Sequence, residues 1–495
     1  MAERKGSRDS AVDGIDYLSP ALRKELQSIE EQFEISTAKL KEIVARFREE
    51  LQEGLEREGA NLSMYVTWTL GFPSGSETGS YIAVDLGGTN LRVCWITLHG
   101  RGQDVEIEQT KYKLPRELKN DSAEHLWDTI AEKLQDFIEK HRLHKDGDAP
   151  LPLGFTFSYP TLQDYVDQGK LKTWTKGWDV KGVEGEDVSA QFRTAISKRA
   201  SHPTEAPKAN LPVKLVALVN DTVGAMIASA YNDKETIIGA IFGTGCNAAY
   251  MDDVGTIPKL KTSLPRETPM AINCEYGAFD NARRVLPLTK YDLTIDEQSP
   301  RPGEQTFEKM SAGLYLGEIF RLIIIDLHDR GLIFKGQNVS NLRDSYVLDT
   351  EFLSSLEDDP LKQTRTRFEE QLNVSITYEE LQLVHRLAEI VALRGARLCT
   401  AGIAAICLKK GIASGHVAAD GSVANKHPKF KARWAQALSE VLDWPADRKE
   451  DPIIITSAED GSGVGAAVIA AMTLERAKKG IKAGIQEEIT DVADR

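Results

Sequence analysis

Residues 81–98 have the sequence YIAVDLGGTNLRVCWITL, in which a glycine-rich turn separates two apolar stretches. After the turn, Leu91, Val93 and Trp95 occupy every second position, which is the pattern of a strand rather than of a helix. The paired glycines allow positive φ angles and bring backbone N–H groups close to an anion. The stretch therefore predicts a phosphate-binding hairpin, with Asp85 at its mouth to hold a hydrated Mg²⁺. Taken alone, it is equally compatible with an ordinary tight hairpin.

Two well-known phosphate-binding loops do not fit this stretch. A Walker A loop ends in Gly-Lys-Ser or Gly-Lys-Thr, and no lysine follows Gly88. A dinucleotide fingerprint opens a helix, whereas the residues after this turn have the pattern of a strand. The hairpin therefore predicts a different kind of nucleotide site.

Two further glycine turns strengthen the nucleotide interpretation. Residues 237–252, IIGAIFGTGCNAAYMD, again place a turn, at 243–247, between two apolar stretches. Residues 459–465, EDGSGVG, precede an alanine-rich segment and predict a turn that opens a helix. One Gly-Thr hairpin lies in each half of the chain, so the two are expected to face one another. Together they would clasp the phosphates of a nucleotide from both sides.

The composition is that of a soluble globular protein, because 41% of the 495 residues are hydrophobic and 27% are charged. The length allows about two to three domains. The net charge of −14 argues against a general nucleic-acid-binding protein. An anionic substrate would therefore depend on local positive groups, either loop amides or a few basic side chains.

Cysteine use and hydropathy predict a cytoplasmic protein without a membrane span. The five cysteines are scattered and never spaced as Cys-x-x-Cys, which is typical of a reduced intracellular compartment. The first residues, MAERKGSRDSAVDG, lack the apolar segment of a secretory signal. The longest apolar run, residues 400–408, is too short to cross a bilayer. Residues 1–17 are expected to be disordered.

Hydrophobic periodicity predicts helices and strands on either side of these turns. Helices are expected from residue 20, from residue 36 or 37, and over 122–141, each with a buried apolar stripe. Residues 306–330 are expected to form one long helix, and the helical stretch 378–410 is expected to break near Gly395 and Gly402. Buried strands are expected before Ser158 and over 213–219.

Polar residues gather where these strands end, and in open α/β folds the chemistry lies at such positions. Carboxylates and amides in these numbers predict a site for a neutral ligand rich in hydroxyl groups. Each residue alone has a purely structural alternative: Asn220 a helix cap, Glu318 a solvated helix residue, Lys176 a surface charge. The candidate ligand-binding residues are Ser158, Thr175, Lys176, Asn220, Asp221, Asn247, Glu275 and Glu318.

Nine segments of the chain, taken together and in order, resemble the hexokinase/glucokinase family of fungi and animals. The resemblance covers about residues 20–480 and corresponds to one catalytic unit. Single segments such as DGSV carry little weight, but the set is specific. The segments are DLGGTNLRV, LGFTFSYP, WTKGW, VNDTVG, GTGCNAAY, NCEYGAFDN, GLYLGE, DGSV and DGSGVGAA.

The resemblance implies an α/β fold, the duplicated ribonuclease-H-like architecture shared with actin and the heat-shock ATPases, with two lobes around a cleft. A small lobe would comprise residues 76–220, to which 463–480 return. A large lobe would comprise 18–75 and 221–462, and residues 481–495 would form a C-terminal tail. Closure of the lobes around a sugar would assemble the site only when the sugar is bound.

The resemblance also implies roles for individual residues in the transfer of phosphate from MgATP to the 6-hydroxyl of glucose, the first step of glycolysis. Asp221 would be the catalytic base, with Lys176 beside it, and all eight polar residues would surround the sugar. Asp85 would hold Mg²⁺ through water. The nucleotide would contact Asp85, Leu86, Gly87, Gly88, Thr89, Asn90, Gly243, Thr244, Gly245, Ser422, Gly461, Ser462 and Gly463.

Other functions remain open at this point. A catalytically silent glucose sensor with the same fold would tolerate damage to Asp221 or to the glycine turns, and all are intact. An actin-like or chaperone-like ATPase would not need the WTKGW and NCEYGAFD segments. Trp178 and Tyr276 replace aromatic residues usual in many relatives, so they bear on sugar preference. A glucose-selective glucokinase is slightly favoured over a broader hexokinase, and no oligomeric state is predicted.

Overall fold

The structure is a computed structural model that describes residues 18–88, 90–100, 103–145, 148–199, 211–358, 360–458, 460–486 and 488–492. The expectation of disorder for residues 1–17 therefore lies outside the described residues. So does Thr89, which was predicted to contact the nucleotide.

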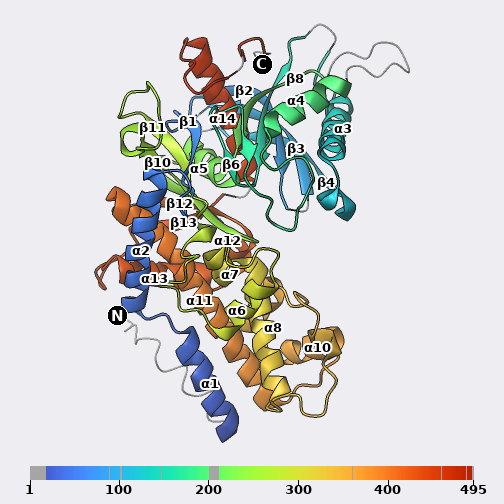
Figure 1. Cartoon of the computed structure of the whole chain (residues 1–495), viewed down its shortest axis with the longest axis vertical. Helices are drawn as coiled ribbons and strands as arrows, with labels where there is room; N and C mark the ends of the chain where they lie inside the picture. Colours follow the sequence, from blue (N-terminus) through green and yellow to red (C-terminus); the bar gives the residue numbers. More distant parts are fainter. Residues whose placement is uncertain are drawn as a thin grey trace.

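A five-stranded sheet has the order β4-β3-β2-β5-β8 and contains the first glycine turn (Figure 1). The hairpin β2–β3 is antiparallel and β4 extends it, whereas β5 and β8 run parallel to β2. The strands are β2 (Thr78–Leu86), β3 (Asn90–His99), β4 (Glu106–Lys113), β5 (Leu151–Phe157) and β8 (Val213–Val219). A short hairpin of β6 (Thr161–Leu162) and β7 (Lys170–Leu171) lies between β5 and β8 in the chain.

Helices cover both faces of this sheet. On one face, α3 (Ala123–His141) and α4 (Val188–Arg199) pack against apolar side chains of β2 and β5. On the other face, α14 (Gly461–Lys478) lies against β2, β5 and β8. The approach of α14 is close, because a Cβ on Gly154 of β5 would lie 2.5 Å from the backbone oxygen of Ala466. The third glycine turn therefore opens a helix, as predicted, and that helix returns to the first sheet.

A six-stranded sheet has the order β1-β11-β10-β9-β12-β13 and contains the second glycine turn. Its hairpin β9–β10 is antiparallel and β11 extends it, whereas β12 and β13 run parallel to β9. This repeats the plan of the first sheet, with β1 added at one edge. The strands are β1 (Tyr65–Leu70), β9 (Thr236–Phe242), β10 (Cys246–Asp253), β11 (Pro269–Asn273), β12 (Gly415–Asp420) and β13 (Ile453–Ser457).

The helices α5 (Asp221–Asn232) and α14 follow the last strands of the two repeats and pack on one another. A Cβ on Gly465 would lie 2.1 Å from the carbonyl oxygen of Gly224, so only glycine permits this crossing. The duplicated α/β architecture predicted from the sequence is confirmed by these matching sheets and helices. The predicted lobe boundaries stay a prediction.

The remaining helices cover the six-stranded sheet and extend away from it at the lower end of Figure 1. One core joins the sheet to α2, α11 and α13, and a second core joins α1 to α8, α9, α10 and α11. These helices are α1 (Pro20–Phe33), α2 (Thr37–Glu56), α6 (Lys290–Gln298), α7 (Thr306–Ser311), α8 (Gly313–Asp329), α9 (Thr350–Asp358), α10 (Leu361–Leu372), α11 (Tyr378–Lys410), α12 (Ser422–Lys426) and α13 (Phe430–Val441). Short 3₁₀ turns are η1 (Arg116–Asn120), η2 (Val254–Thr256), η3 (Tyr276–Ala278) and η4 (Ser340–Leu342).

Two helix predictions were wrong. Helix α11 is continuous through Gly395 and Gly402, because these glycines make room for neighbours rather than for a break. A Cβ on Gly402 would lie 2.7 Å from the Tyr276 ring. Conversely, the expected single helix 306–330 is two helices, since Ala312 is extended and the Gly313 N–H donates to the Gly243 carbonyl at 2.7 Å. The break docks α8 on the second glycine turn.

Helix α11 is long and apolar enough to pass a compositional test for a membrane span, but 89% of its apolar window is buried inside the fold. It contributes side chains both to the core that covers the six-stranded sheet and to the second core, formed with α1, α8, α9 and α10. Each of the five cysteines is a buried free thiol.

Candidate active site

A cavity of about 710 Å³ lies between the two glycine hairpins. Both sheets and the helices that follow them supply its lining, so residues far apart in the chain meet there. The predicted site residues that line it are Asp85, Gly87, Gly88, Ser158, Thr175, Lys176, Asn220, Asp221, Gly243, Thr244, Gly245, Asn247, Glu275, Ser422 and Ser462.

Some residues predicted to contact the nucleotide do not line the cavity. Leu86 is buried in the core of the first sheet, and Asn90 accepts a hydrogen bond from the Gly87 N–H within the turn. Gly461 packs against Ala225 of α5, and Gly463 lies against Cys94 and Ile96. These residues shape the turns that carry the cavity-lining groups.

The prediction for Glu318 was wrong. Its side chain is 2% exposed, receives hydrogen bonds from both Arg321 nitrogens Nε and Nη2, and accepts the Tyr346 N–H at 2.6 Å. A carboxylate this closely paired inside α8 does not face the cavity. Sequence reasoning chose the wrong acid of the segment 306–318.

Glu308 occupies the position that Glu318 was expected to fill. It lies in α7, lines the cavity, and accepts the Cys246 N–H at 3.1 Å, next to the second glycine turn. Burial raises the pKa of the Glu308 carboxyl, and the Cys246 N–H offsets part of that rise. The signal available in the sequence was its position in the first turn of a helix.

Glu275 lies between β11 and η3 in a conformation that few residues adopt. Its φ of 51° lies in the left-handed region, and such strain is concentrated at functional positions. The carboxylate accepts hydrogen bonds from the amide nitrogens of Asn273 at 2.8 Å and Asn247 at 3.2 Å. Burial raises the pKa of Glu275 to about 7, although the Asn273 bond works against the rise. A partly buried acid that lines the cavity and is held by two amides is suited to accept hydrogen bonds from hydroxyl groups.

Asp221 lies where β8 gives way to α5. Asn220 caps this helix by accepting the Thr222 N–H at 2.9 Å, which leaves Asp221 in the first turn facing the cavity. The Lys176 Nζ lies 3.7 Å from Asp221 Oδ2 and donates to the Ser158 carbonyl at 2.8 Å. Lys176 has a φ of 57°, and its loop brings it across the cavity to the carboxylate. The Asp221 carboxylate and the Lys176 ammonium are thus held close together, and both residues line the cavity.

The nucleotide side of the cavity contains an ion pair that sequence reasoning missed. Arg92 faces Asp85 across the β2–β3 hairpin, and its Nη2 donates to Asp85 Oδ2 at 2.8 Å. The Ser462 hydroxyl donates to the same oxygen at 2.8 Å, and Arg92 Nη1 reaches Asp460 at 2.7 Å. Burial raises the pKa of Asp85, and Arg92 offsets part of this rise. Hairpin register alone pairs position 85 with 92, so the signal was present in the sequence.

Two more cations, Lys111 and Lys119, line the cavity. Lys119 Nζ stands 5.6 Å from the centre of the Trp178 ring, and burial lowers its pKa. The negative net charge predicted local positive groups near an anionic ligand, but nothing in the sequence singled out these two side chains.

The cavity-lining residues fit a Mg²⁺ ion whose ligands are mainly phosphate oxygens of the substrate and water. Within the described part of the chain, no cluster of three or more His, Cys, Asp or Glu residues has the arrangement of a metal site. The cavity nevertheless presents the carboxylates of Asp85 and Asp420 on the side of the glycine turns. Mg²⁺ commonly binds through one or two carboxylates, water and substrate phosphates, so this donor set is adequate.

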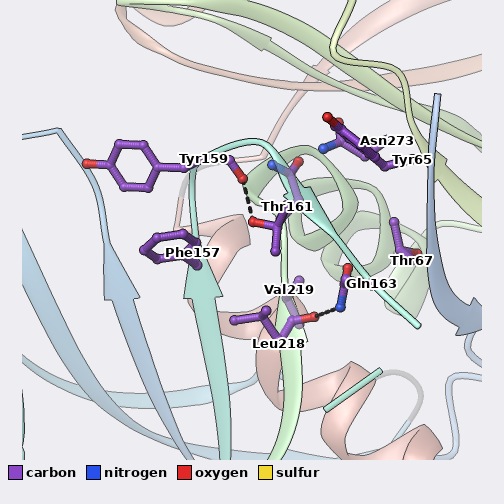
Figure 2. A pocket seen from close by; sticks show the side chains of 10 residues that line it. Tyr65, Thr67, Phe157, Tyr159, Thr161, Gln163, Leu218, Val219 and Asn273 are labelled. Carbon is purple, nitrogen blue, oxygen red and sulfur yellow. Dashed lines mark hydrogen bonds between the residues drawn. The ribbon is translucent and has the colours of Figure 1, made fainter. Parts of the chain in front are cut away.

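A small second pocket, which Asn220 also lines, lies where β1, β8 and β11 approach one another (Figure 2). Its volume of about 10 Å³ is close to that of one water molecule, too small for a sugar. Figure 2 shows Thr161 donating to the Tyr159 carbonyl and Gln163 donating to the Leu218 carbonyl. The pocket belongs to the junction between the sheets.

Comparisons with known proteins agree over nearly the whole chain. Two sequence models, both described as hexokinase, match residues 25–231 and 237–472. The hexokinase of Emericella nidulans is 53% identical over 472 residues, covering 94% of each chain. Hexokinase-1 of Saccharomyces cerevisiae is 47% identical, covering 94% of this chain and 95% of the relative. A solved hexokinase of Schistosoma mansoni, complexed with glucose, has a TM-score of 0.82 and 35% identity, covering 91% of this chain and 99% of that chain.

Proposed function

The chain belongs to the hexokinase family, and from this we propose that it transfers the γ-phosphoryl group of ATP to the 6-hydroxyl of glucose. One observation carries the proposal: the hydroxyl-binding residues and both glycine hairpins line a single cavity of about 710 Å³. A silent glucose sensor is disfavoured, because Asp221, Lys176 and the turns are all present in that cavity.

The sugar would lie among polar groups from both sheets. Hydroxyl groups of the hexose would be held by Asn247, Glu275 and Glu308 from one side, and by Ser158 and Thr175 from the other. The hydrogen bonds that the side-chain amides of Asn247 and Asn273 donate to Glu275 support this role, since they orient the carboxylate before the sugar binds. Preorientation of this kind reduces the entropy lost on binding.

Asp221 would accept the proton of the 6-hydroxyl as that oxygen attacks the γ-phosphorus. The new O–P bond forms while the bond to the β-phosphate oxygen breaks, and ADP leaves. Phosphoryl transfer passes through a loose transition state, so positioning and charge neutralisation supply most of the catalysis. Lys176, 3.7 Å from Asp221, is placed to neutralise the transferring oxygens as well as to orient the base.

The two glycine hairpins would hold the phosphates through backbone N–H groups and the Thr244 hydroxyl, with Ser422 near the adenosine. Asp85 would hold Mg²⁺ through water, and the ion would neutralise charge on the β- and γ-phosphate oxygens. Arg92 keeps Asp85 in place by its ion pair. The lining residues up to Asn220, with Ser462, form one wall of the cavity, and those from Asp221 to Ser422 form the other. Because sugar residues come from both walls, their approach would exclude water and limit hydrolysis of ATP. A cytoplasmic location stays a prediction.

A coupled assay of ADP release with glucose, fructose and mannose tests the proposal, with Asp221→Asn as a matched control. We expect turnover with glucose that EDTA abolishes and that the variant lacks. Its dependence on each sugar decides between glucose-selective and broad specificity. Absence of sugar-dependent ADP release with all three sugars would contradict the proposed function.

A further inference from the structure

An ion pair outside the cavity joins the two walls. Arg301 Nη2 lies 3.0 Å from Glu184 Oε1. Arg301 precedes α7, which packs in the core of the six-stranded sheet, whereas Glu184 precedes α4, which packs in the core of the five-stranded sheet. The two side chains are 42% and 40% exposed and do not line the cavity.

Glu184 is tied to the loop that carries Thr175 and Lys176. Its Oε1 accepts the Trp174 N–H at 2.6 Å and the Thr173 hydroxyl at 3.2 Å. These donors and Arg301 outweigh burial and lower the pKa of Glu184, so the carboxylate is ionised near neutral pH. Trp174 directly precedes the cavity-lining residues Thr175 and Lys176. The position of Glu184 therefore affects the position of this loop.

Arg301 is tied in the same way to the segment that carries Gln305 and Glu308. Its carbonyl accepts a hydrogen bond from Lys309 Nζ at 2.9 Å, and that ammonium is paired with Asp296 at 2.6 Å inside the fold. Gln305 and Glu308 lie between Arg301 and Lys309 in the chain, and both line the cavity. The backbone of Arg301 is thus anchored to a buried ion pair, Lys309 with Asp296.

We propose that Arg301 and Glu184 form a latch that positions the two sugar-binding walls against one another. The inference rests on the proposed function, because it assigns the latch to the hexose end of that site. The contact of Lys176 with Asp221 also joins the walls, but it lies where the reacting groups must enter, whereas the latch residues do not line the cavity. Both latch residues are positioning residues, without contact to the reacting atoms.

A double-mutant cycle tests the latch: Arg301→Gln, Glu184→Gln and the double variant. Each single change is expected to raise the KM for glucose about two- to fivefold, the range for a partly exposed ion pair, with kcat and the KM for ATP within about twofold. The double variant should match the stronger single variant, since either change removes the same contact. Glu304→Gln is the control, because Glu304 pairs with Arg301 at 3.8 Å without reaching the opposite wall.

Glucose affinity measured by tryptophan fluorescence separates the latch from the proposed chemistry. Trp174 and Trp178 flank Thr175 and Lys176 in the loop that lines the cavity, so their fluorescence should report sugar binding. Non-additive losses of affinity in the cycle, weakened at high salt and without a change in Tm, support the latch. Additive effects, or affinities equal to that of the unaltered protein, overturn it. An unaltered protein that binds glucose without phosphorylating it overturns the proposed function instead, while the cycle in Kd still judges the latch.

Discussion

The two walls of the cavity differ in charge. Lining residues up to Asn220, with Ser462, form one wall and belong to the five-stranded sheet, its loops and α14, whereas lining residues from Asp221 to Ser422 form the other. Among the described lining residues, all cations lie on the first wall and all acids but Asp85 lie on the second. The first wall carries Arg92, Lys111, Lys119 and Lys176, and the second carries Asp221, Glu275, Glu308 and Asp420.

This division explains how a chain of net charge −14 can bind an anionic nucleotide. Cations gathered on one wall attract the phosphates, and this electrostatic attraction has a range of roughly 8 Å at physiological salt. On the opposite wall, burial raises the pKa values of Glu275, Glu308 and Asp420, and the neighbouring Asp221 carboxylate adds to each rise. Lys176 offsets only part of the rise for Glu275 and Glu308. Both acids line the cavity, where they can accept hydrogen bonds from a neutral sugar.

Removal of the central acid should have the largest effect. Asp221→Ala is expected to lower kcat by about 10²–10⁴, the usual contribution of a positioned general base. Asp221→Asn keeps the shape and loses the basicity, so steady-state kinetics of the two variants separate proton transfer from sugar binding. If the Asn variant keeps kcat within about tenfold, proton acceptance is not what Asp221 supplies.

Removal of the cation that faces this acid should be next. Lys176→Met is expected to lower kcat about 10²-fold, as when one preorganised donor to a transition state is lost. Lys119→Gln is the matched change on the same wall and should cost less than about tenfold, because Lys119 stands over the Trp178 ring rather than beside Asp221. Equal losses in the two variants would mean that the wall acts only through its total charge.

The two glutamates of the segment 306–318 should separate sugar binding from folding. Glu308→Gln is expected to raise the KM for glucose about tenfold, since a charged acceptor of sugar hydroxyls is lost. Glu318→Gln should leave that KM unchanged and lower Tm, because breaking a buried pair costs about 3–5 kcal/mol. Thermal melts and kinetics on both variants decide, and the reverse pattern would restore Glu318 to the sugar site.

A change of pH should have the smallest effect. Because burial raises the pKa of Glu275 to about 7, the folded protein holds this proton more tightly than the unfolded chain. The resulting stabilisation is complete below the unfolded pKa, near 4.5, and is lost as pH rises through about 7. Glucose binding needs the ionised form, so its KM should rise by up to about tenfold from pH 8 to pH 6. Glu275→Gln should flatten this profile, and an unchanged profile would exclude Glu275 as the titrating group.

The sequence predicted the repeated hairpins, the helix after the third glycine turn and the polar strand ends, because period-2 patterns and glycine pairs report local backbone geometry. It failed where neighbours decide. Gly402 of α11 leaves room for the Tyr276 ring within an unbroken helix, and a glycine that ends a helix looks the same in the sequence.

The sequence by itself determined which residue types stand at the turns and strand ends, since these follow from local conformation. Only the tertiary structure decided which side chains meet. Glu308 and Glu318 belong to one apolar segment, and the extended Ala312 between them sets the direction of each helix separately. Glu308 therefore faces the cavity while Glu318 is paired with Arg321. The hydrogen bond from Gly313 to Gly243 accompanies that break, and a contact between residues so distant in the chain leaves no periodic trace in the sequence.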